Sequence, residues 1–124
     1  MQSSTMKIYW NDCGRGPHFD APVDVTFEEA DRISTDEVRG VQGNFIGLID
    51  EQDRTIQFYF EEGIPEHVDD ARHLKTVLMD FPQPDKKGSY ARKVMIGEVR
   101  DLIEQAFQVG ADYRQFGRLT FVPW

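Results

Sequence analysis

Apolar and polar residues alternate along the middle of the chain, which is the pattern of a half-buried β-strand. Over residues 54–61, Ile56, Phe58 and Phe60 share one face, while residues between them, such as Gln57, share the other. One face of this strand should meet the core and the other should stay partly in water. Apolar runs bounded by turn-forming residues predict five further strands, over residues 6–10, 44–50, 74–81, 89–95 and 118–122.

Two segments show helical periodicity instead. The first follows Thr26, which forms a predicted capping box with Glu29, and it should end near Ser34 or one turn later. The second ends at Gly110, a residue suited to a helix end, and its apolar face consists of Val99, Leu102, Ile103, Ala106 and Phe107. The predicted order is β-α-β-β-β-β-α-β. The fold class is α+β, with a mostly antiparallel sheet of five to six strands and two helices packed on it.

Length and cysteine content restrict the class of protein. The 124 residues fit one domain, so residues 1–124 are treated as a single α+β domain. Cys13 is the only cysteine, and the absence of a possible internal disulfide favours a reducing compartment and a cytoplasmic location. The N-terminus is polar and no apolar run approaches a membrane span, so we expect neither a signal peptide nor a membrane partner.

The formal net charge of −8 narrows the classes of partner. A negative protein repels phosphate backbones, so nucleic-acid binding is disfavoured, and the small basic cluster around Lys86 and Lys87 does not offset this. The same charge attracts basic proteins and speeds their association. We expect a protein partner, with the chain itself a monomer or a homodimer. A contribution to solubility is the ordinary alternative explanation of this charge.

The acidic residues gather in a predicted hairpin tip and in the loop that follows the next strand. If both lie at one end of the sheet, they form an acidic patch, to which aromatic residues add the anchors that interfaces prefer. Solvated acidic surfaces are the ordinary alternative. The residues expected to contact a partner are Asp50, Glu51, Asp53, Tyr59, Glu61, Glu62, Glu66, Asp69, Asp70 and Trp124.

Three parts of the chain hold reactive residue types, but none completes a catalytic or metal-binding motif. Cys13 and His18 could form a nucleophile and base pair or ligate a metal, and His67 and His73 flank two aspartates that could hold a cation. The alternative is that both segments are structural loops without a chemical role. Asp80, within an apolar strand, fits either a buried acid with a raised pKa or an outward-facing residue. We predict no catalytic residue, metal or cofactor, and keep a small enzyme or metal-binding protein as the alternative.

Part of the chain resembles the immunity proteins of bacterial polymorphic toxin systems, in particular the Imm1-like group. The resemblance spans about residues 40–124 and rests on the closing helix and strand and on three segments: Gly43-Asn44-Phe45-Ile46, Thr55-Ile56-Gln57-Phe58 and Leu78-Met79-Asp80-Phe81-Pro82. It implies a cytoplasmic protein that binds and blocks a cognate toxin, often a nuclease. An acidic inhibitor would mimic the phosphate charge that a basic toxin cleft accepts. A homodimeric structural or regulatory subunit, paired through a sheet edge, is a further alternative.

Overall fold

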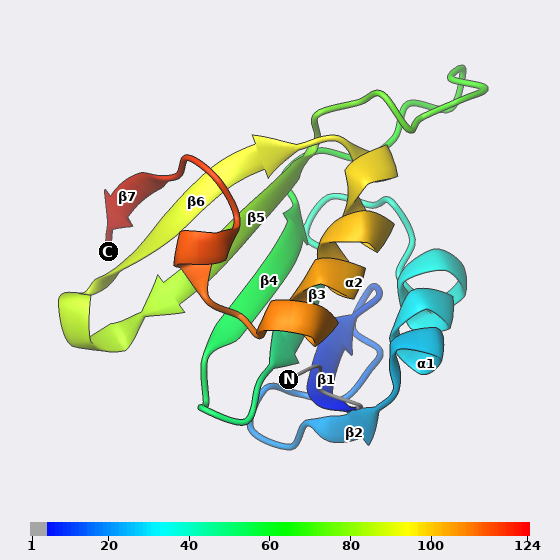
Figure 1. Ribbon diagram of the computed structural model, residues 1–124. Coiled ribbons are helices and arrows are strands. Elements are labelled where there is room, and N and C mark those ends of the chain that lie inside the picture. Colours follow the sequence, from blue (N-terminus) through cyan, green and yellow to red (C-terminus); the bar gives the residue numbers. More distant parts are fainter. Residues whose placement is uncertain (1–4) are drawn as a thin grey trace.

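Seven strands form a single antiparallel sheet, and two helices pack against one of its faces (Figure 1). The computed structural model describes residues 5–124. The strand order is β2-β1-β3-β4-β5-β6-β7, so from β3 onward each strand lies beside the one that follows it in sequence. The strands are β1 (Met6–Asn11), β2 (Val23–Val25), β3 (Phe45–Ile49), β4 (Thr55–Phe60), β5 (Val77–Gln83), β6 (Gly88–Val94) and β7 (Thr120–Pro123).

The α+β class, the antiparallel sheet and the two helices are confirmed. All six predicted strands are present, with their ends shifted by up to three residues, but the sheet has one strand more than the five to six expected. The additional strand is β2, which pairs with β1 through Met6 opposite Val25 and Ile8 opposite Val23. Three residues are too few to display a period of two, so the sequence pattern could not reveal this strand.

The first helix, α1 (Phe27–Arg32), begins at the predicted capping box. The Glu29 backbone N–H donates to Thr26 Oγ1 (3.3 Å), and the Thr26 N–H donates to Glu29 Oε1 (3.0 Å). A wider π-type turn, η1 (Ile33–Glu37), continues the helix, so the later of the two expected ends is the correct one. The helix is thus fixed at its start by local hydrogen bonds.

The second helix, α2 (Val99–Val109), follows the 3₁₀ turn η3 (Ile96–Glu98) and ends at Gly110, as predicted. Gly110 has a φ of +78°, which favours glycine. A Cβ atom there would also lie 2.7 Å from Arg54 Nη2 and 2.8 Å from Asp50 Oδ2. The β3–β4 hairpin can therefore approach the end of α2 only because residue 110 is glycine. Two more 3₁₀ turns, η2 (Pro84–Lys86) and η4 (Tyr113–Gln115), lie before β6 and β7.

Both helices are short. α1 has six residues and α2 has eleven, whereas a helix that spans a bilayer needs about 20. Within residues 5–124, no helix is long and apolar enough to cross a membrane.

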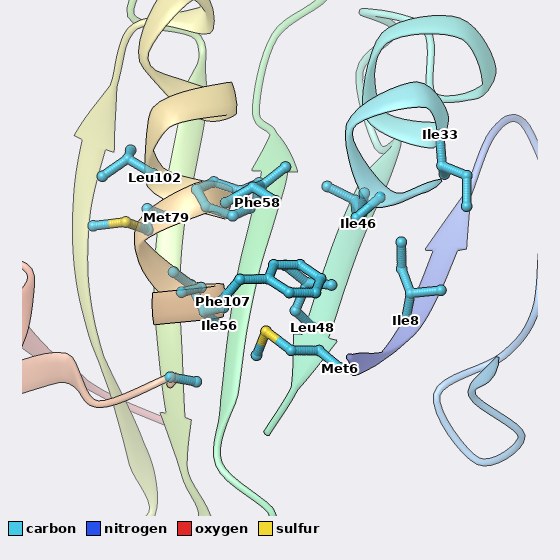
Figure 2. Packing of buried hydrophobic residues seen from close by; sticks show 14 of the residues in the cluster. Met6, Ile8, Ile33, Ile46, Leu48, Ile56, Phe58, Met79, Leu102 and Phe107 are labelled. Atoms are coloured by element: carbon cyan, nitrogen blue, oxygen red, sulfur yellow. The ribbon is translucent and has the colours of Figure 1, made fainter. Parts of the chain in front are cut away.

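The core is one layer of apolar side chains between the sheet and the two helices (Figure 2). In β4, Ile56 and Phe58 are buried in this layer while Gln57 is not, which confirms the alternation expected for this strand. Because alternate residues of a strand point to opposite faces, each buried residue leaves its neighbours on the other side of the sheet. The residues labelled in Figure 2 are Met6, Ile8, Ile33, Ile46, Leu48, Ile56, Phe58, Met79, Leu102 and Phe107.

Candidate binding face of the sheet

The sheet face opposite the helices is not covered by any helix of residues 5–124, and we call it the open face. Its side chains alternate with the core residues of β1 and of β3 to β6. Most are half-buried, and apolar or aromatic residues outnumber charged ones, as in the centre of a protein interface. The open face consists of Lys7, Tyr9, Phe45, Gly47, Ile49, Thr55, Gln57, Tyr59, Leu78, Asp80, Pro82, Ser89, Ala91 and Lys93.

A row of four residues crosses the open face from β1 to β5. Tyr9 lies opposite Gly47, Gly47 opposite Gln57, and Gln57 opposite Asp80. The Tyr9 hydroxyl donates a hydrogen bond to Gln57 Oε1 (2.6 Å), so the tyrosine reaches over β3 to β4. A Cβ atom on residue 47 would lie 2.1 Å from Tyr9 Cζ. Glycine is therefore required at position 47 by this close approach, not by its backbone angles.

Asp80, at the end of this row, is a half-buried carboxylate that no hydrogen bond or ion pair with residues 5–124 compensates. Burial raises its pKa from 3.8 to about 6. Burial, and secondarily the negative charge of Asp80, also raises the pKa of Tyr9. Because one pKa unit corresponds to about 1.4 kcal/mol, ionised Asp80 destabilises the folded chain at neutral pH by up to roughly 3 kcal/mol.

Other acidic residues with little exposure show how unusual Asp80 is. Asp12 accepts hydrogen bonds from Arg39 Nε (3.1 Å) and from Asn44 Nδ2 (2.9 Å), and the hydrogen bonds from Arg39 are the main cause that lowers its pKa. Asp112 accepts from Arg114 Nε (2.9 Å), with the same effect on its pKa. The described residues therefore supply these aspartates with cations but supply none to Asp80.

Beyond the Tyr59 end of the open face, two further oxygen atoms have no hydrogen-bond partner among the residues that the structure describes. They are Glu61 Oε1 and Thr76 Oγ1, and both are buried. The two residues are neighbours, since the Glu61 N–H donates to the Thr76 carbonyl oxygen (2.9 Å). Lys93 Nζ lies 3.8 Å from Glu61 Oε1. Buried polar atoms without partners are uncommon in folded proteins, so this end of the face also has unused capacity for hydrogen bonds.

The two acidic segments do not meet in one patch, because they lie at opposite ends of the sheet (Figure 1). The hairpin tip with Glu51 and Asp53 precedes β4, and the loop over residues 61–70 follows it. A strand of six residues separates them by roughly 20 Å. Of the residues expected to contact a partner, Tyr59 lies on the open face and Glu61 at its end. The other four expected contact residues of that loop are exposed and do not belong to the row that ends at Asp80: Glu62, Glu66, Asp69 and Asp70.

Trp124, another expected contact residue, lies next to the open face. Its side chain is 69% exposed, and its Nε1–H donates to Ser89 Oγ (3.1 Å) on β6. Beside β1, at the other end of the same face, Phe19 is 70% exposed and its ring meets the ring of Tyr9 edge-on. An exposed aromatic side chain therefore extends the open face at each edge.

Asp50, by contrast, has a structural role that its sequence context did not predict. Its carboxylate accepts hydrogen bonds from the backbone N–H groups of Gln52, Arg54 and Ala111 and from Arg54 Nε, at 2.8–2.9 Å. Only 4% of its side chain is exposed. Asp50 thus ties the β3–β4 hairpin to the segment after α2 and presents no free carboxylate to a partner.

The alternative sites for an enzyme or a metal-binding protein lie in exposed loops. Cys13 and His18 are exposed in the segment after β1, where the Cys13 N–H donates to Asn44 Oδ1 (2.8 Å). His67 and His73 are exposed in the segment before β5. Among residues 5–124, no three His, Cys, Asp or Glu side chains are arranged to hold a metal ion. Neither pair therefore belongs to a larger cluster of metal-binding side chains in the part of the chain that the structure describes.

No protein-family model matches this sequence, and no curated protein or solved structure is similar enough to count as a match. The resemblance to toxin-immunity proteins therefore stays a prediction. An α+β fold hosts many functions, so the function has to be inferred from the open face itself.

Replacing Asp50 by alanine should strongly destabilise the fold. The change leaves three backbone N–H groups and the Arg54 guanidinium without their acceptor, which costs about 3 kcal/mol. Urea denaturation would measure the free energy of unfolding, with Glu51→Ala as the control because Glu51 is adjacent and exposed. Equal stability of the two variants would show that Asp50 does not hold the hairpin.

Replacing Asp80 by asparagine should stabilise the fold, and more so at higher pH. The pKa is 3.8 in the unfolded chain and about 6 in the folded one, so between these values the folded state binds more protons and the free energy of unfolding falls as the pH rises. We expect the advantage of Asp80→Asn to grow by about 1–2 kcal/mol between about pH 4.5 and 7.5. Denaturation at both pH values would test this, with exposed Asp36→Asn as the control. A difference that does not change with pH would contradict it.

Proposed function

We propose that this chain is a protein-binding module of the immunity or inhibitor type, which acts in the cytoplasm and neutralises a cognate basic protein, such as a toxin, by docking its open face on it. The observation that supports this most directly is the row that ends at Asp80. Within residues 5–124, this half-buried carboxylate has no cation beside it, and it lies in a largely uncharged sheet face that no helix covers. Residues that lower stability in this way are commonly retained for function.

The shape of the open face suits a macromolecule better than a small molecule. Small-molecule sites are concave and enclose most of their ligand, whereas this site is the surface of a sheet. Five strands spaced about 4.8 Å apart and about five residues long give a face of roughly 24 Å by 17 Å, or about 400 Å². A standard protein interface buries about 800 Å² on each partner. The partner should therefore also contact the rim, where Phe19 and Trp124 are exposed.

The charge of the chain suits a basic partner. The net charge is −8, and acidic segments lie at both ends of the sheet, with Glu51 at one end and Glu62 at the other. Acidic groups around a contact attract a basic protein over long distances and raise the association rate more than they raise the affinity. The acidic segments would thus guide the encounter, while the open face provides the contact.

The proposal is tested by inserting the same charge on either face of the molecule. Leu78→Glu places a carboxylate on the open face, and Val109→Glu places one at the end of α2 on the helix side. The wild-type protein and both variants would each serve as bait for proteins in lysate of the source organism. The basic protein that the wild type retains would be identified by mass spectrometry and purified. We expect Leu78→Glu to weaken the affinity of the chain for this basic protein at least about tenfold, because an unpaired charge would be buried in the contact. Equal retention by both variants would overturn the proposal.

Reversing the charge at the rim should slow association with that purified partner. Glu51→Lys and Glu62→Lys each change the net charge from −8 to −6 without touching the open face. Each should lower the association rate constant about twofold at low salt, with little effect on dissociation. Surface plasmon resonance at low and high salt would measure both rates. A change confined to the dissociation rate would place the altered residue inside the contact instead.

A further inference from the structure

We infer that the open face recognises one basic side chain of its partner, a lysine or an arginine, at the carboxylate of Asp80. The inference rests on the proposed protein-binding function and specifies what the partner must present at the centre of the contact. It follows from the position of Asp80, from the pairing of nearby Lys93 with Glu61 instead of Asp80, and from the surface around the carboxylate.

Asp80 lies on β5, an interior strand of the open face that has a neighbouring strand on each side. Gln57 of β4 and Ala91 of β6 are directly opposite it on its two sides, and Leu78 and Pro82 precede and follow it on the same face of β5. A docked partner would therefore exclude water from Asp80 more completely than from the rim. A pair of opposite charges is stronger in such a dehydrated centre than at a solvated edge.

The basic residue that β6 contributes to the open face does not pair with Asp80. Lys93 lies opposite Leu78, and its Nζ is 3.8 Å from Glu61 Oε1. Asp12, Asp50 and Asp112 each have an arginine partner from within the chain. A buried carboxylate without a cation is unfavourable, and removing that penalty favours binding of a cation from outside.

The surface around Asp80 fits a lysine or arginine side chain rather than a metal ion. Divalent cations such as Ca²⁺ need several oxygen ligands, and the part of the chain that the structure describes groups no three such side chains around any point. A basic side chain needs one carboxylate for its charged end and apolar surface for its aliphatic stem. Leu78 and Pro82 provide that surface on both sides of Asp80.

The inferred contact makes binding depend on pH. The titratable groups that share the open face with Asp80 are Lys7 and Tyr9 on β1, Tyr59 on β4, and Lys93 on β6, which lies near Glu61; the pKa of Tyr9 is raised. A cation binds the ionised form of Asp80, whose pKa is about 6 in the free chain. Only about one tenth of the carboxylate is ionised at about pH 5, so affinity for the cation should fall about tenfold from neutral pH.

The test uses N-acetyl-arginine amide as the probe and its citrulline analogue as the matched control, which keeps the size and planar shape of the side-chain end but replaces one NH₂ group by a carbonyl oxygen and so lacks the charge. Amide chemical shifts of the full chain would be followed by nuclear magnetic resonance at constant ionic strength and at about pH 7.5 and 5. We expect the arginine probe at the higher pH to shift the amides around Gln57, Asp80 and Ala91. The citrulline probe and the Asp80→Asn variant should remove these shifts, and the lower pH should weaken the affinity of the arginine probe about tenfold.

The outcomes separate this inference from the proposed function. Shifts confined to the hairpin tip or to the loop over residues 61–70, or shifts unchanged in Asp80→Asn, would overturn the inference while leaving protein binding by the open face intact. Equal retention of the partner by Leu78→Glu and Val109→Glu would overturn the proposed function, whatever the probe does. Asp80→Asn is a usable variant because it removes a destabilising charge and keeps the size of the side chain.

Discussion

Burial of one face of the sheet beneath two short helices is the constraint on which the rest of the structure depends. The apolar layer between them includes residues that alternate along the strands, such as Ile56 and Phe58 of β4. A shift of pairing by one residue would turn this layer toward water, so the register of every strand is strongly fixed. The same constraint determines which residues lie on the open face, because each buried residue leaves its neighbour on the other side.

The aspartates with little exposure differ in whether the fold supplies them with a partner. Acidic residues that are needed for structure receive a cation or several N–H groups, as Asp12 receives Arg39 and Asp50 receives Arg54 together with the Ala111 N–H. Asp80 receives neither from residues 5–124, although its strand lies in the interior of the sheet. An unpaired carboxylate at such a position lowers the stability of the isolated chain, and binding of a basic group would remove that penalty.

The two edges of the sheet differ from its centre. β2 has three residues and β7 has four, ending in Pro123, so both edge strands are short. Short edges and proline are devices that limit pairing with the sheets of other molecules. The surface best suited to a partner is therefore the open face rather than the backbone of an edge strand, which weakens the case for a homodimer paired edge to edge.

Several local features could be predicted from the sequence because their causes are local. The capping box at Thr26, the end of α2 at Gly110 and the alternation along β4 each depend on a few neighbouring residues. Exposure of aromatic residues at a candidate interface could be predicted only in part: Trp124 was expected, whereas Phe19 was not. β2 was missed because a three-residue strand exists only through its pairing with β1.

The sequence by itself determined the fold class, the two helices and six of the seven strands, since periodicity and turn-forming residues are read along the chain. Only the tertiary structure decided which polar residues meet. Tyr9, Gln57 and Asp80 are separated by tens of residues and join in one row through the register of four strands. Likewise, the acidic hairpin tip and the acidic loop lie on either side of β4 in sequence, and the strand between them holds them at opposite ends of the sheet. The pattern of residues specifies which face of a strand is buried, but contacts across strands depend on register and loop geometry, which the pattern does not contain.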